Sequence, residues 1–175
     1  LLSRGLGDVY KRQEHGRAST NVETRDDRLG KQLRLQFPLM QWERAAPILH
    51  QLRFVKSEIE IALIKHACGI TNKAFHRILN YTEIGKMEYE LEAEITHEFL
   101  INRSKGHAYQ PIIAGGKNAC VLHYTENNDV LNDGDLILMD FGAEYSNYNS
   151  DMTRVIPVNG RFSKRQKEVY NAVLH

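Results

Sequence analysis

The chain has 175 residues, with 23 Lys and Arg against 22 Asp and Glu, and two cysteines. A net charge of +1 gives no field of the kind that nucleic-acid or anionic-membrane binders show, so we expect neither partner. Two cysteines are too few for a disulfide framework, and no apolar run reaches the roughly 18 residues of a membrane span. These features favour a cytoplasmic protein.

The first part of the chain differs in composition from the rest. Residues 1–13 resemble translated adapter or vector sequence, and we expect them to be a non-native leader. Residues 14–52 are rich in charge and poor in apolar periodicity, which predicts a disordered segment and the tail of a preceding N-terminal domain or linker. The sequence does not begin with Met, and the helical pattern that begins at Ser163 is still incomplete at residue 175. We therefore expect a fragment.

Two amphipathic helices are predicted after residue 53. Apolar residues recur at spacings of three and four over residues 59–79, which is the pattern of a helix with one buried face. Ser57 followed by Glu60 is a capping-box pattern, so the first helix is predicted to begin directly after Ser57. A second helix is predicted from about Lys86 to Arg103.

Strands follow Gly106. The apolar segments between glycine- and asparagine-rich turns predict strands at residues 111–114, 119–122, 136–139 and 151–158. A last helix begins near Ser163. This order predicts an α+β domain in which two amphipathic helices pack on an antiparallel β-sheet and the start of a further helix follows.

Two aspartates form a candidate metal site. Asp140 ends the apolar strand LILMD, and Asp151 begins the next predicted strand. If the connecting turn centres on Tyr145 and Ser146, the two aspartates lie directly opposite each other, with Cβ atoms roughly 4.5–5.5 Å apart. Carboxylates this close repel unless a proton or a cation lies between them, and a divalent ion would resolve the conflict. Two solvated turn residues are the alternative.

His123 is the second candidate. It follows the apolar segment 119–122 and precedes a polar loop, a position from which a side chain can face a cleft. The pKa range of histidine suits proton transfer or hydrogen bonding to a substrate. A histidine at the rim of the core is the alternative.

Several ordered segments together resemble the first half of the catalytic domain of aminopeptidase P, the Xaa-Pro aminopeptidase of the pita-bread metallopeptidase family. The matching segments are FVKSEIEIALIKHACGIT, YELEAEITHEF, VLHYTENN and LNDGDLILMDFGAEYSNYNSDMTRVIPVNGRFSKRQKEVYNAVL. The resemblance covers about residues 53–175 and includes the spacing from His123 to Asp140 and Asp151. It implies that this range is the first half of a pita-bread fold.

The resemblance also implies a function. The enzyme would release the N-terminal residue of peptides that carry proline at the second position. Asp140 would chelate one of two divalent metal ions, usually manganese, and Asp151 would bridge both, with a hydroxide shared by the ions attacking the peptide carbonyl. His123 would be the catalytic residue that contacts the substrate near the scissile bond, and Thr153 would support the metal ligands from behind.

The later half of the family's fold supplies a histidine and two glutamates that complete the ligand set. Because the chain does not include them, we expect it to be inactive as it stands, and the intact protein to be the enzyme and to form homo-oligomers. Two alternatives stay open: a prolidase that cleaves Xaa-Pro dipeptides, and a non-catalytic pita-bread module that binds peptides or proteins. Retention of Asp140 and Asp151 argues against the module.

Overall fold

The computed structural model describes residues 23, 25–41, 43 and 45–174. The chain divides into two compact units, Leu1–Lys56 and Ser57–His175. The first unit contains helices α2 (Arg25–Gln36) and α3 (Ala46–Phe54), in a range where the composition predicted little regular structure. The expected leader, residues 1–13, lies outside the described residues, and the division of the chain into leader, linker and catalytic half stays a prediction.

The second unit begins with helix α4 (Glu58–Tyr81), which starts where the sequence predicts. The Ser57 hydroxyl accepts the backbone N–H of Glu60, and the Glu60 carboxylate accepts the N–H of Ser57 at 2.7 Å. The capping box therefore forms. The buried residues of α4 recur at spacings of one, three and four along one stripe: Ala67, Ile70, Thr71, Ala74 and Ile78.

Helix α5 (Glu88–Ile101) packs against α4. Its apolar residues Leu91, Ile95 and Phe99 are wholly buried. They recur every four residues, so they form a second apolar stripe that faces the same core as α4.

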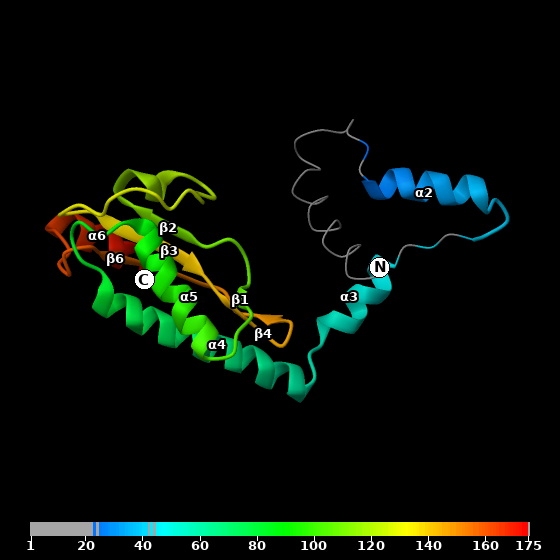
Figure 1. The fold of residues 1–175 in the computed structure, drawn as a ribbon, viewed down its shortest axis with the longest axis horizontal. Helices are drawn as coiled ribbons and strands as arrows, with labels where there is room; N and C mark the ends of the chain where they lie inside the picture. Colours follow the sequence, from blue (N-terminus) through cyan, green and yellow to red (C-terminus); the bar gives the residue numbers. More distant parts are fainter. Residues whose placement is uncertain (1–22, 24, 42, 44, 175) are drawn as a thin grey trace. The chain divides into compact units, whose positions relative to one another are not determined.

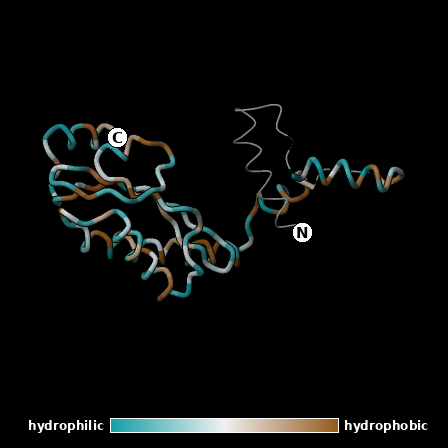
Figure 2. Tube along the Cα trace, turned by 45° about the horizontal axis from the view of Figure 1, so that its top comes forward, coloured by the Kyte–Doolittle hydropathy of each residue, from teal (hydrophilic) through white to brown (hydrophobic). Residues whose placement is uncertain are grey.

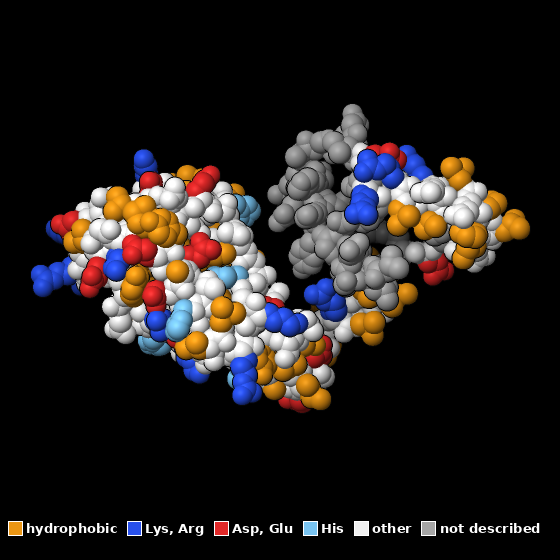
Figure 3. Space-filling model, in the orientation of Figure 1, with side chains coloured by type: hydrophobic (Ala, Val, Ile, Leu, Met, Phe, Trp, Pro, Cys, Tyr) orange, Lys and Arg blue, Asp and Glu red, His pale blue; other side chains and the backbone are white. Residues whose placement is uncertain are grey.

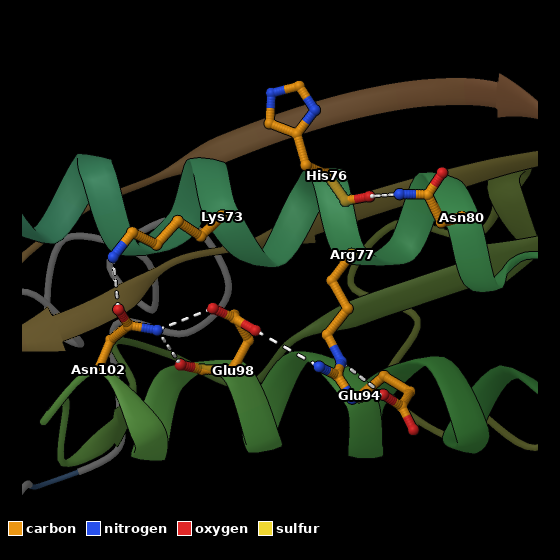
Figure 4. A network of polar contacts seen from close by, with 7 residues as sticks. All are labelled: Lys73, His76, Arg77, Asn80, Glu94, Glu98 and Asn102. Carbon is orange, nitrogen blue, oxygen red and sulfur yellow. Dashed lines mark hydrogen bonds and ion pairs between the residues drawn. The ribbon is translucent and has the colours of Figure 1, made fainter.

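A polar network joins the two helices on their outer side (Figure 4). Arg77 of α4 forms ion pairs with Glu94 and Glu98 of α5, and Lys73 donates to the side chain of Asn102 at 2.6 Å. Partly exposed pairs of this kind contribute at most about 1 kcal/mol each. Packing of the apolar stripes therefore holds the helices together, and the network orients them.

Two three-stranded antiparallel sheets follow the helices. The first has the order β2-β3-β6 and the second the order β1-β4-β5. Their strands are β1 (Gly106–His107), β2 (Ile112–Gly115), β3 (Leu136–Phe141), β4 (Ala143–Tyr145), β5 (Tyr148–Asn149) and β6 (Met152–Pro157). Only Gly142 separates β3 from β4, and only Ser150 and Asp151 separate β5 from β6, so one long hairpin runs through both sheets.

Helices α4 and α5 cover one face of the first sheet (Figure 1). On β3, the residues that face the helices, Ile137, Met139 and Phe141, are wholly buried, whereas the alternating Leu136, Leu138 and Asp140 are half-buried. Hydrophobic residues recur along the strands and the helices beside them (Figure 2). Because side chains alternate along a strand, Asp140 lies on the sheet face away from the helices.

One predicted strand is wrong. Residues Gly116–Cys120 form a short 3-10 helix, η1, and a loop follows it. The apolar run at 119–122 does not enter the core, because Val121 and Leu122 are 54% and 87% exposed. The predicted last helix is present as α6 (Lys164–Leu174). The α+β class, with two helices on an antiparallel sheet, is confirmed.

Charges of both signs are mixed on the face of the second unit that Figure 3 shows. Within the described part of the chain, no helix has both the length and the apolar content that crossing a bilayer requires.

Candidate metal centre

Asp140 and Asp151 converge on one hydroxyl group. The Oη atom of Tyr109 lies 2.6 Å from Oδ1 of Asp140 and 2.9 Å from Oδ1 of Asp151. Asp140 and Tyr109 are half-buried, and Asp151 is exposed. The two aspartates predicted to bind metal are therefore neighbours, and the residue that links them is one that the sequence analysis missed.

The hairpin between the aspartates turns one residue later than predicted. Tyr145 pairs with Tyr148, so Ser146 and Asn147 are the turn residues. Both have positive φ, 52° and 68°, as a two-residue type I′ turn requires. Moving the centre of the turn by one residue moves every strand pairing by two.

The aspartates are consequently not directly opposite each other, as we expected. Asp140 pairs with Thr153, which makes Asp151 its diagonal neighbour. A shift of two residues leaves each side chain on the same sheet face, whereas a shift of one would have reversed it. The prediction of a shared face therefore holds although the predicted pairing is wrong.

Tyr109 reaches both carboxylates because the chain bulges between β1 and β2. His107 pairs with Ala143 and Ile112 pairs with Asp140. From His107 to Ile112 the chain advances five residues, whereas the segment that pairs with it, from Asp140 to Ala143, advances only three. Two extra residues must leave the regular ladder, and Tyr109 lies among them. A signal was present in the sequence, since Pro111 has no N–H to donate and marks an interruption of pairing.

Gly142 and Ser150 set the position of Asp151 through the backbone beside it. A Cβ at Gly142 would overlap the carbonyl oxygen of Ser150, so only glycine lets the two strands approach this closely. The Ser150 hydroxyl is buried beside that of Thr71 in α4, 2.6 Å away, and the N–H of Ala143 lies 2.9 Å from each of these oxygens. Through this contact, helix α4 fixes the position of Ser150, the residue that precedes Asp151.

The Tyr109 hydroxyl cannot satisfy both carboxylates of the site at once. Burial, and then the hydrogen bonds to Asp140 and Asp151, hold the pKa of Tyr109 well above its usual range, so the hydroxyl stays protonated. A hydroxyl has one proton and donates to one carboxylate at a time. Two carboxylates that face the same oxygen repel each other, and a cation between them removes the repulsion.

The residues present fit a divalent cation in chemistry. Carboxylate oxygens are the ligands that hard divalent ions such as Mn²⁺ take. Among the described residues, however, no group of three or more His, Cys, Asp and Glu side chains is placed to hold a metal ion. Asp140 and Asp151 are thus an incomplete ligand set.

Thr153 and His123, the other two predicted site residues, do not contact the aspartates in the same way as Tyr109. Thr153 is exposed and opposite Asp140, so it lies on the face that carries the carboxylates. His123 is exposed in the loop after η1, with φ 55°. No hydrogen bond or ion pair within residues 45–174 joins His123 to either aspartate.

Comparison with known proteins identifies the family of the chain. Metallopeptidase family M24 matches residues 62–175. The Xaa-Pro aminopeptidase of Escherichia coli (strain K12) is 40% identical over 178 residues, which cover 99% of this chain and 40% of that protein. The Xaa-Pro aminopeptidase of Haemophilus influenzae is 44% identical over 136 residues, which cover 78% of this chain and 31% of that protein.

The same similarity extends to the fold. The solved structure of proline aminopeptidase P II from Yersinia pestis superposes with a TM-score of 0.73 at 46% identity, covering 74% of this chain and 30% of that one. The fold therefore matches the first part of the pita-bread fold, as the resemblance implied. The chain spans about 40% or less of the length of these relatives, and it belongs to metallopeptidase family M24.

Proposed function

We propose that the chain is part of a metal-dependent aminopeptidase that releases the N-terminal residue of peptides with proline at the second position. The observation that carries the proposal is the convergence of Asp140 and Asp151 on the Tyr109 hydroxyl. Two carboxylates that face one oxygen repel each other, and a cation between them removes this repulsion. A non-catalytic peptide-binding module has no use for such a pair.

This function gives a role to each residue of the candidate site. Asp140 and Asp151 would hold two divalent ions, which when bound polarise the scissile carbonyl and activate water at neutral pH. The Tyr109 hydroxyl restricts the rotamer of the carboxylate to which it donates, and Thr153 lies where it can support Asp140. Asp140 is held on a strand with a wholly buried opposite face, so its position is rigid before any ion binds.

His123 would act on the substrate. Its exposed imidazole can donate to or accept from a peptide near the scissile bond. An Xaa-Pro bond is a tertiary amide without an N–H, so recognition of this bond depends on its carbonyl oxygen, a group to which a histidine N–H can donate.

Two carboxylates alone bind two ions weakly, so we expect the 175-residue chain by itself to be inactive. Manganese as the metal, a homo-oligomeric state and a cytoplasmic location also stay predictions. The identity of the metal can be tested directly, by competition between Mn²⁺, Co²⁺ and Zn²⁺ for the site.

The test compares metal content and hydrolysis of an Xaa-Pro peptide in a longer protein that contains the chain and in the chain alone. Asp140→Asn and Asp151→Asn should each lower bound Mn²⁺ and reduce turnover by at least about a hundredfold. Asp133→Asn is the matched control, because Asp133 is an exposed aspartate whose side chain accepts from Asn159 at 2.7 Å, away from the candidate metal centre. Full metal content and turnover in Asp151→Asn would overturn the proposal.

A further inference from the structure

A buried carboxylate outside the candidate metal centre organises the loop that carries His123. Glu88, the first residue of α5, is wholly buried. Its Oε1 accepts the N–H of Gly115 at 2.7 Å, and its Oε2 accepts the N–H of Asp129 at 2.9 Å. An acidic residue in the first turn of a helix is favoured by the helix dipole, and these donors satisfy its charge.

Tyr124 is the contact between Glu88 and the loop. Its hydroxyl donates to Oε2 of Glu88 at 2.7 Å and accepts from the side chain of Asn118 at 3.1 Å. The side chain is only 8% exposed, and burial together with the Glu88 hydrogen bond raises the pKa of Tyr124 to about 12. Tyr124 is therefore a neutral donor locked onto α5 at neutral pH.

A second contact lies one helical turn further along α5. Glu92 accepts from the side-chain amide of Asn127 at 2.8 Å, and the same amide donates to the carbonyl of Pro111 at 3.0 Å. The Asn127 side-chain oxygen accepts the N–H of Ile113 at 2.9 Å. Asn127 is 2% exposed with φ 45°, so its strained backbone is held by a fully used side chain.

His123 lies directly before the first of these contacts. Its φ of 55° is uncommon for a residue with a Cβ, and its own side chain is exposed. The conformation of His123 must therefore be maintained by its neighbours, and Tyr124 is the adjacent residue with a buried anchor.

We propose that Glu88 and Glu92 are positioning residues: through Tyr124 and Asn127 they hold the loop of residues 123–127 and so set where the imidazole of His123 meets a substrate. This inference rests on the proposed function for the role of His123. The anchoring of the loop does not, because it stands on the contacts alone. The two parts are therefore tested separately.

The anchoring is tested by amide hydrogen exchange, measured by mass spectrometry. Tyr124→Phe removes one hydroxyl and keeps the ring, so the chain should still fold. We expect exchange over residues 121–130 to become faster, with that of α4 unchanged. Tyr148→Phe is the control, because it removes a similar hydroxyl bonded to Glu60 at 2.9 Å. Unchanged exchange in the loop of Tyr124→Phe would overturn the anchoring.

The positioning is tested by a double-mutant cycle in a peptidase-active protein that contains the chain. Tyr124→Phe should lower kcat about tenfold with little change in KM, and by less than about twofold when His123→Ala is already present. Equal losses in both backgrounds would mean that Tyr124 does not act through His123. Full activity of His123→Ala would instead overturn the proposed role of His123, while the exchange result still decides the anchoring.

Discussion

The hydroxyl groups of Thr71 and Ser150 lie 2.6 Å apart in the core, and the backbone N–H of Ala143 is within 2.9 Å of both oxygens. The contact joins the middle of α4 to the point where β5 passes into β6. Polar groups buried in this way must be fully paired to be tolerated. The arrangement therefore fixes one position of helix and hairpin relative to each other.

Thr71→Val should destabilise the second unit by about 1–2 kcal/mol, since the methyl group keeps the shape of the side chain but leaves the Ala143 N–H with one fewer acceptor. Chemical denaturation measures the loss. Ser150→Ala should not add its full effect in the double variant, because both residues serve one network. Strictly additive losses would show that the two hydroxyls act independently.

Gly142→Ala should cost at least about 2 kcal/mol, because the added Cβ would overlap the Ser150 carbonyl oxygen. The control is Gly69→Ala in α4, where a Cβ meets nothing within 4 Å, and which should stabilise the helix by up to about 1 kcal/mol. Thermal unfolding of both variants checks the pair of predictions. A Gly142→Ala protein as stable as the parent would contradict the close strand approach.

Tyr124 should make stability fall in alkaline solution. Its folded-state pKa is raised to about 12 from an ordinary value of 10.0, so its contribution is complete below pH 10 and is lost as the pH rises towards 12. Denaturation of the parent and Tyr124→Phe at about pH 8 and pH 11 should show the larger alkaline loss in the parent. Parallel losses would contradict the prediction.

His107 should make stability fall in acidic solution. Burial lowers its pKa, with the charge of Glu92 partly opposing the shift. A half-buried neutral histidine contributes stability above the unfolded pKa of about 6.5, and this contribution is lost as the pH falls through the lower folded pKa. An NMR titration of the His107 ring should give a midpoint below that of an unfolded peptide, and His107→Gln should flatten the acid loss of stability.

The helices could be predicted from the sequence because their signals are local. Ser57 and Glu60 define the start of α4 within four residues, and the apolar spacing defines its buried stripe. The shared face of Asp140 and Asp151 could also be predicted, because side chains alternate strictly along a strand.

The pairing and the linking residue could not be predicted because they depend on contacts distant in sequence. The turn was misplaced since Ser146 and Asn147 carry positive φ without the glycine that usually marks it. Tyr109 was missed because only the two-residue bulge against β4 and β3 brings it to the aspartates. The run at 119–122 was misassigned because a short apolar segment has the same composition whether it is buried or exposed.

The side chain of Asn127 affects whether another molecule can add a strand to the edge of the sheet. Strand β2 is the outermost strand of its sheet, and the Asn127 amide pairs with the N–H of Ile113 and the carbonyl of Pro111 as a neighbouring peptide group would. Outer strands with unpaired backbone groups invite a strand from a second molecule and lead to aggregation. One asparagine, covered by Glu92, thus closes part of this border against strand addition.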